Sequence, residues 1–164
     1  MYRTYTETDD GELWVMNADG SNQRMVISGH GEYPTWSPDS KSLAYAGDGS
    51  YNIRRVMIDG TGDALVIGDS AYEMSPAWSP DGEWIAFHTQ ADFDVLGERG
   101  MGPELEIHLI RPDGTDDHRI TDNFAEDAFA EWSSDGQYLM WVRHGELVIA
   151  RPTALRYGRS RGAR

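Results

Sequence analysis

The sequence PAWSPDGEWIAFHTQ, at Pro76–Gln90, occurs in nearly the same form at two other places in the chain, and this repetition predicts the fold. The other copies are PTWSPDSKSLAYAGDG at Pro34–Gly49 and FAEWSSDGQYLMWVRHG at Phe129–Gly145. Each copy has a Trp, a Ser, an Asp-Gly or Asp-Ser turn and a short apolar run. Trp36 and Trp78 lie 42 residues apart, and Trp132 follows after 54 because of an insertion at residues 91–102. A repeat of about 40 residues with several short strands has the size of one four-stranded propeller blade.

A second repeated element lies between these Trp motifs. It reads ELWVMNADGSNQRMVIS (Glu12–Ser28), NIRRVMIDGTGDALVIG (Asn52–Gly68) and ELEIHLIRPDGTDDHRIT (Glu104–Thr121), with a clipped copy ELVIARP (Glu146–Pro152). Asp-Gly between two strand-like runs predicts a β-hairpin with a type I′ turn, which has positive φ at both central residues. Each repeat therefore predicts two hairpins with strands a to d. Strands a and b turn at the WSPDG segment, and strands c and d turn at Asp19-Gly20, Asp59-Gly60 or Asp113-Gly114.

At these two elements the chain resembles the TolB-like, or PD40 (WD40-like), propeller repeats. Their hallmark is an I/L-x-V-M-N-x-D-G-S/T segment followed by P-x-W-S-P-D-G-x-x-I-A-F, and the resemblance covers about residues 2–152. The chain departs from it at Ser40, which replaces the turn Gly, at Ser134, which replaces the motif Pro, and at residues 154–164. The resemblance implies an all-β fold, a β-propeller built of four-stranded antiparallel blades. Trp36, Trp78 and Trp132 recur in register, which predicts that they are structural residues of the repeat.

The repeats predict fourteen strands, which make about three and a half blades. The first is a b strand at Tyr2–Thr8 and the last a c strand at Glu146–Ala150. The predicted blade units are residues 1–28, 29–68, 69–121 and 122–152, followed by a basic and disordered tail at 153–164. Propellers usually have four to eight blades, so three arrangements stay open. The chain is a piece of a larger ring, a compact four-bladed ring, or one member of a homo-oligomer that closes the ring.

Composition narrows the classes of partner. The 164 residues carry a net charge of −14 and no Cys, so disulfide and thiolate chemistry are excluded. A chain this acidic repels phosphate backbones, which argues against nucleic acid and favours cationic ligands or basic protein surfaces. The sequence contains no run of 18 apolar residues, which is the length that a membrane-spanning helix needs. The first residues show no signal region, whereas the resemblance implies a periplasmic or envelope location.

The variable segments predict where a ligand binds. Hairpin topology places the a–b and c–d turns at one end of each blade and the b–c and d–a connections at the other. The d–a connections differ among the repeats, and loops of this kind usually carry function. Their carboxylates Glu32, Glu73 and Asp127 are expected to converge at the channel mouth, where they could hold Ca²⁺ or bond their own loop backbone. Their aromatic residues are candidate anchors for a peptide or sugar: Tyr33, Tyr72 and Phe129.

The sequence holds no recognisable catalytic motif. It lacks the Gly-x-Ser-x-Gly elbow, the His-Glu-x-x-His pair and the phosphate loop. The favoured prediction is a non-enzymatic scaffold that docks a peptide or partner protein, as the resemblance implies. Two alternatives stay open: the gating propeller of a prolyl-oligopeptidase-type peptidase, and a carbohydrate-active propeller similar to oligogalacturonate lyases. The second needs a His-rich metal centre, which five scattered histidines make a poor match. Separately, His88 and His108 on neighbouring predicted strands could form a zinc site with an acid, or they are ordinary strand histidines.

Overall fold

The computed structural model describes residues 2–5, 11–68, 72–90, 105–123 and 125–151. Regular structure in this part of the chain consists of strands, and it contains no helix of a length and hydrophobicity that could cross a membrane. The 91–102 insertion, the 153–164 tail and the second half of the predicted Tyr2–Thr8 strand lie outside the described residues.

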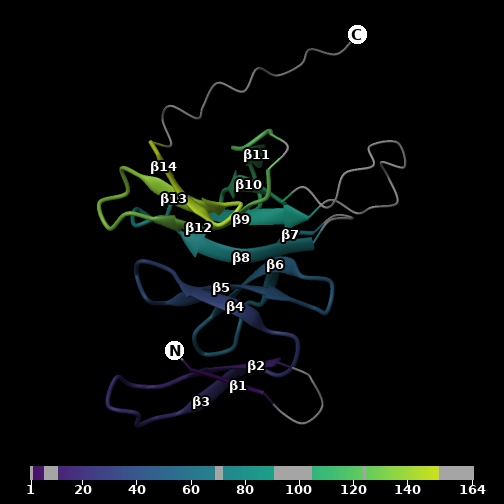
Figure 1. The fold of residues 1–164 in the computed structure, drawn as a ribbon. Coiled ribbons are helices and arrows are strands. Elements are labelled where there is room, and N and C mark those ends of the chain that lie inside the picture. Colours follow the sequence, from purple (N-terminus) through teal and green to yellow (C-terminus); the bar gives the residue numbers. More distant parts are fainter. Residues whose placement is uncertain (1, 6–10, 69–71, 91–104, 124, 152–164) are drawn as a thin grey trace.

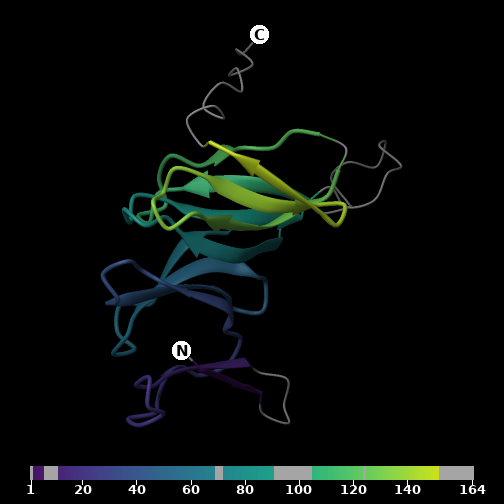
Figure 2. The same ribbon diagram turned by 60° about the vertical axis from the view of Figure 1, so that its left-hand side comes forward.

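Fourteen strands form four antiparallel sheets, each built from consecutive strands. The first sheet contains β1 (Tyr2–Tyr5), β2 (Gly11–Val15) and β3 (Arg24–Ile27), and the second contains β4 (Glu32–Trp36), β5 (Ser42–Gly47), β6 (Asn52–Met57) and β7 (Ala64–Ile67). The third contains β8 (Tyr72–Trp78), β9 (Ile85–Gln90), β10 (Leu105–Ile110) and β11 (His118–Arg119), and the fourth contains β12 (Asp127–Trp132), β13 (Leu139–Arg143) and β14 (Glu146–Ala150). Figures 1 and 2 show these sheets stacked face to face in sequence order, as successive blades. The predicted all-β class is confirmed.

The a–b turns share one hydrogen-bond pattern, which is formed by the Ser and the Asp of the WSPDG segment. In the second blade the Ser37 hydroxyl donates to Asp39 Oδ1 at 2.7 Å, and the Lys41 N–H donates to the same oxygen at 3.1 Å. The equivalent Ser–Asp bonds of the third and fourth blades are both 2.6 Å long. The fourth blade keeps its bond although Ser134 replaces the motif Pro, because the contact needs only the Ser and the Asp.

The c–d turns lie where the Asp-Gly pairs predict them, but they are not type I′ turns. Only the Gly has positive φ, at 82° for Gly20 and 84° for Gly114, whereas the preceding Asp does not. The Asp carboxylate instead accepts hydrogen bonds from the Ser or Thr that follows the Gly, as Asp113 does from the Thr115 N–H and hydroxyl at 3.0 and 2.6 Å. Such a turn, closed by one left-handed Gly, is the three-residue hairpin with a bulge.

The core lies between the blades. Three apolar clusters join neighbouring sheets, and each takes side chains from both of them. The motif residues Trp36, Trp78 and Trp132 end β4, β8 and β12 and pack at the edges of these clusters. The Trp132 indole N–H also donates to the Ala77 carbonyl of the preceding blade at 3.2 Å. Blade stacking is thus the main source of burial, since an isolated sheet would leave both faces open.

Candidate functional site

The inner strands β4, β8 and β12 share a β-bulge that the sequence did not reveal. Their pairing registers shift between Glu32 and Thr35 in β4, and at the equivalent places in β8 and β12. One residue of each bulge is left-handed: Tyr33 (φ 47°), Ser75 (φ 52°) and Phe129 (φ 57°). This conformation costs a residue with a Cβ roughly 1–2 kcal/mol. Bulges re-aim side chains, and they are frequent next to functional sites.

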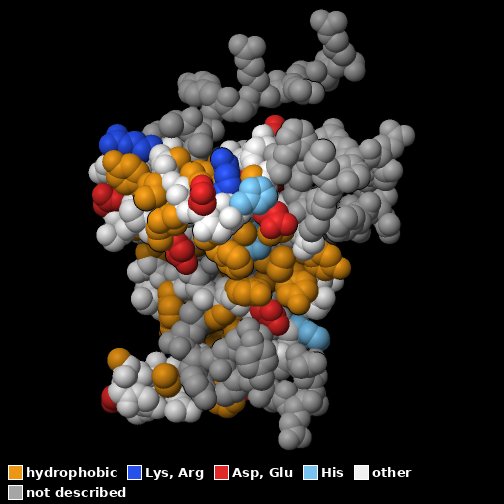
Figure 3. Space-filling model, in the orientation of Figure 1, with side chains coloured by type: hydrophobic (Ala, Val, Ile, Leu, Met, Phe, Trp, Pro, Cys, Tyr) orange, Lys and Arg blue, Asp and Glu red, His pale blue; other side chains and the backbone are white. Residues whose placement is uncertain are grey.

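Aromatic side chains are exposed around these bulges, as predicted. Tyr33 is 43 % exposed, Tyr72 is 45 % exposed and Phe129 is 56 % exposed. The Tyr72 ring meets the Tyr51 ring edge to face at 5.7 Å, which joins the third blade to the b–c connection of the second. Figure 3 shows hydrophobic side chains gathered on this side of the two middle sheets, with acidic side chains and histidines among them. We call Tyr33, Tyr51, Tyr72 and Phe129 the aromatic face.

A pocket of about 180 Å³ opens beside this face in the second blade. It is lined by His30, Glu32, Ala46, Gly47, Gly49 and Tyr51. Gly47 has no room for a side chain, because a Cβ there would lie 2.5 Å from a Tyr45 ring carbon. Gly49 has a φ of 72° and faces the His30 ring. The pocket lining thus combines the aromatic Tyr51, two glycines and the acidic Glu32, a combination suited to a cationic side chain.

The three predicted carboxylates do not act as one set. The β8 residue equivalent to Glu32 is Met74, the neighbour of Glu73. Because neighbouring residues of a strand point to opposite faces, Glu32 points away from the side that Glu73 and Asp127 occupy. Glu73 is 1 % exposed and Asp127 is fully buried, and both lie in strands rather than in the loops where we expected them. Within the described residues, no group of three or more His, Cys, Asp or Glu could hold a metal ion. The calcium hypothesis therefore lacks its expected ligand set.

Asp127 instead ties two strands of the fourth blade together. Its carboxylate accepts hydrogen bonds from Arg143 Nε and Nη2 at 2.7 and 2.8 Å, and from Trp141 Nε1 at 2.9 Å. The Asn123 amide donates to the same carboxylate at 2.6 Å. Burial raises the pKa of Asp127, but the hydrogen bonds from Arg143, Asn123 and Trp141 outweigh it and hold the pKa below its usual value. This geometry indicates a structural carboxylate.

Glu106 in β10 is a second paired and buried carboxylate, which lies in the third blade. It is 3 % exposed, and it accepts hydrogen bonds from the Arg119 guanidinium, from the Thr121 hydroxyl and from the Asn123 N–H. Asn123 therefore links the buried acids of two neighbouring blades. Neither pairing was found from the sequence, because each Arg lies 13 or 16 residues away from its acid and only the strand register brings them together.

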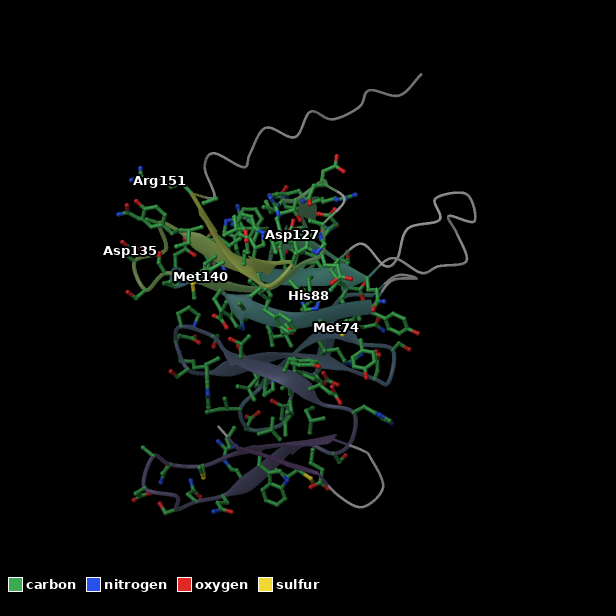
Figure 4. The ribbon with its side chains drawn as sticks, viewed as in Figure 1. Met74, His88, Asp127, Asp135, Met140 and Arg151 are labelled. Carbon is green, nitrogen blue, oxygen red and sulfur yellow. The ribbon has the colours of Figure 1, made fainter. Side chains whose placement is uncertain are left out.

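His88 and His108 do not form the pair that we considered for zinc. His88 is opposite Ile107 in the β9–β10 register, so the two His side chains point to opposite faces. His108 Nδ1 lies 3.1 Å from Asp117 Oδ1, whereas His88 is 3 % exposed and accepts a hydrogen bond from the Phe129 N–H at 3.4 Å. Burial lowers the pKa of His88 to about 4, which keeps the ring neutral at physiological pH. In the view of Figure 4, His88 lies between Met74 and Asp127.

Comparisons with known sequences give partial matches, and no family model matches the chain. An uncharacterized protein of Agrobacterium fabrum is 27% identical over 146 residues, which cover 87% of this chain and 46% of that protein. The Tol-Pal system protein TolB of Desulfosudis oleivorans is 37% identical over 70 residues, which cover 42% of this chain and 14% of that protein. This chain thus spans less than half the length of these relatives.

Solved structures also give partial matches, and TolB proteins are among them. A protein of Agrobacterium tumefaciens provisionally assigned as TolB has a TM-score of 0.72 and 26% identity, covering 87% of this chain and 49% of that one. TolB of Acinetobacter baumannii has a TM-score of 0.71 and 20% identity, covering 92% and 37%. The tricorn protease has a TM-score of 0.65 at 14% identity over 86% of this chain and 14% of that one, a likeness of fold alone. The resemblance to TolB-like propeller repeats is therefore confirmed.

Proposed function

We propose that this chain of TolB-like β-propeller repeats is a non-enzymatic scaffold that docks a peptide segment of a partner protein on its aromatic face. The observation that carries the proposal is the exposure of Tyr33, Tyr72 and Phe129, which are 43 to 56 % exposed at the same ends of the inner strands. Exposed Tyr and Phe side chains supply large apolar area with little conformational entropy to lose, and they are common anchors of interfaces.

The local backbone supports this role. Tyr33 and Phe129 sit in left-handed bulge positions that favour Gly, Asn or Asp, and both side chains stay about half exposed, which limits how far burial offsets the cost. Strained positions of this kind gather at binding sites because the surrounding structure holds them in place. The third blade forms the same bulge with Ser75, so the bulge itself does not require an aromatic side chain.

Charge supports a basic partner. The chain carries a net charge of −14, and the pocket beside the aromatic face contains Glu32. A Lys or Arg side chain of the docked segment would enter this pocket against Tyr51. The similarity to a Tol-Pal system protein supports an envelope or periplasmic location. The likeness to the tricorn protease and to an oligogalacturonate lyase of Vibrio parahaemolyticus, at 14% and 8% identity, shows only the shared fold, so a scaffold is favoured over the enzyme alternatives.

A peptide selection tests the proposal. Random dodecapeptides displayed on phage are selected on the wild-type chain, and the selected peptides are labelled with fluorescein and titrated against it at low and at physiological salt. We expect the selected peptides to be rich in Lys and Arg. Their affinity should fall at least tenfold in the Tyr33→Ala/Tyr72→Ala/Phe129→Ala variant. Salt should weaken binding because exposed charges are screened beyond ~8–10 Å at physiological ionic strength.

Two further variants complete the test. Glu32→Lys should abolish the preference for basic peptides, since the exchange reverses the charge in the pocket. Leu65→Ala is the matched control, because Leu65 is 52 % exposed but lies on the outer strand β7, away from the aromatic face. Equal affinity of the selected peptides for the wild type and the triple aromatic variant would refute the proposed site.

A further inference from the structure

His88 occupies a position that holds small or aliphatic residues in the neighbouring blades. The pairing registers align it with Ala46 in the second blade and with Val142 in the fourth, and each of the three pairs with the residue just before the bulge of its own inner strand. The bulge therefore forms without a histidine in two blades. Ala46 lines the pocket beside the aromatic face, so His88 holds the corresponding place in the third blade. A buried polar ring is costly unless it is hydrogen-bonded, which makes its contacts informative.

The His88 ring contacts the bulge of the following blade. The Phe129 N–H donates to Nδ1 of His88 at 3.4 Å, and the two rings meet edge to face with their centroids 5.3 Å apart. Burial lowers the pKa of His88 to about 4, so the ring is neutral and carries one proton. Because Nδ1 accepts a hydrogen bond, that proton is on Nε2, which makes Nε2 a donor.

This donor has no acceptor within the described residues. The hydrogen bond at Nδ1 is the only one that the His88 ring makes in this part of the chain. The Asp127 carboxylate, in the same strand as Phe129, already accepts four hydrogen bonds from other side chains. His88 is 3 % exposed, but Nε2 is not among the fully enclosed side-chain atoms that lack a partner, so it keeps contact with solvent. A donor thus remains beside the exposed Phe129 ring.

We propose that His88 is a contact residue of the docking site, where its Nε2–H donates a hydrogen bond to a main-chain carbonyl of the segment that covers Phe129. This inference rests on the proposed docking function and adds a polar contact to the aromatic anchors. A neutral acceptor fits this chain, because its net charge of −14 disfavours a carboxylate of the partner. Every residue of a docked segment carries a carbonyl, so the contact would fix the position of the segment along the aromatic face.

Two substitutions separate the roles of the two ring nitrogens. Asn places its side-chain oxygen near the position of Nδ1 and leaves no donor at the position of Nε2, whereas Gln brings an amide donor to the position of Nε2. The affinity of the selected peptides should fall about three- to tenfold in His88→Asn, which is the usual effect of one neutral hydrogen bond. His88→Gln should restore part of this loss. Urea unfolding checks that both variants are folded under the binding conditions.

Two further measurements locate the contact itself. Nitrogen-15 NMR of the wild-type chain reports which ring nitrogen carries the proton, and it should place the proton of His88 on Nε2 at neutral pH. In a selected peptide, the carbonyls are replaced one at a time by thioamides, which are weaker acceptors. One such replacement should weaken binding to the wild type and to His88→Gln, and it should have no effect on binding to His88→Asn.

The outcomes distinguish the contact from the docking function. A proton on Nδ1, or equal affinity of the wild type and His88→Asn, would overturn the contact. The docking function would still stand if the Tyr33→Ala/Tyr72→Ala/Phe129→Ala variant loses binding. Full affinity in His88→Asn with a loss in His88→Gln would show that His88 only holds the Phe129 backbone. Equal affinity of the wild type and the triple aromatic variant would refute the docking function, and the contact with it.

Discussion

Replacing His88 with Val should remove a defined part of the acid sensitivity of the fold. His88 is 3 % exposed, and burial lowers the pKa of its ring to about 4 from an ordinary value of 6.5. The equivalent positions of the second and fourth blades hold Ala46 and Val142, so Val is a residue that the repeat accepts there. The exchange removes the titrating group and keeps a residue that suits a strand.

The sign and size of the effect follow from proton linkage. Above pH 6.5 the ring is neutral in both states and contributes no pH dependence. As the pH falls below 6.5 the unfolded chain binds a proton that the folded chain cannot bind until about pH 4, so stability is lost across this window. The shift corresponds to about 2 kcal/mol lost at pH 5 and about 3 kcal/mol at pH 4, at 1.36 kcal/mol for each pKa unit.

Urea unfolding followed by Trp fluorescence measures the effect at pH 7.5, 6.5, 5.5 and 4.5. The variant should be less stable than the wild type at pH 7.5, because it loses packing and the hydrogen bond from the Phe129 N–H. The gap should shrink and then reverse as the pH falls. The difference between the two proteins isolates His88, since the carboxylates titrate in both. Parallel pH profiles from 6.5 to 4.5 would refute the reasoning, because they would mean that His88 binds its proton over the same pH range in the folded and the unfolded chain.

Two further predictions concern contacts between and within the blades. Gly114→Ala should destabilise the fold more than Gly20→Ala, because both glycines have φ near 83° but only at Gly114 would a Cβ meet a backbone atom, the Val66 carbonyl oxygen at 2.7 Å. Thermal unfolding of both variants measures the difference, and equal losses would show that the second and third blades separate easily at this point. Arg143→Met should cost about 3 kcal/mol at neutral pH, since it leaves the buried Asp127 carboxylate without its cation. That loss should shrink at low pH as Asp127 is protonated, and a loss that does not change with pH would count against a charge effect.

The strands and turns were predictable because short-range chemistry determines them. The Ser and Asp of each a–b turn lie two residues apart, and the Asp of each c–d turn bonds the residue that follows the Gly, as at Asp113 and Thr115. The turn type was wrong because the carboxylate bonds forward along the chain and leaves the left-handed conformation to Gly114 alone. The hairpin position depends on the Asp-Gly pair, whereas the turn type depends on where the Asp side chain bonds.

The arrangement of the site was less predictable, because the pairing register of the strands determines the face to which each side chain points. Glu32 lies four residues before its Trp and Glu73 lies five before, and this offset of one residue places them on opposite faces of their strands. The burial of Asp127 depends on Arg143, which comes from the next strand. A sequence signal for this pair existed, because an Arg at the end of the fourth b strand stands directly opposite the acid in the antiparallel register. The aromatic residues were candidates because their segments differ among the repeats, but the structure places them in strands β4, β8 and β12, and the bulges at Tyr33 and Phe129 were not visible in the sequence.

Replacing Tyr33 with Gly should separate the requirements of the fold from those of binding. Tyr33 is left-handed at φ 47° and 43 % exposed, so its ring gains little from burial while its backbone is strained. Glycine relieves a strain of roughly 1 kcal/mol and gives up a similar amount in conformational entropy, which predicts an unfolding free energy within about 1 kcal/mol of the wild type. Binding of the selected peptides should nevertheless fall several-fold, because an anchor is lost. Ser75→Gly changes the equivalent bulge residue of the third blade and should leave peptide binding unchanged. A large loss of stability in Tyr33→Gly, with binding in proportion to the folded fraction, would show that the ring serves the blade; a stable variant that binds weakly would show that the bulge holds the ring for a partner.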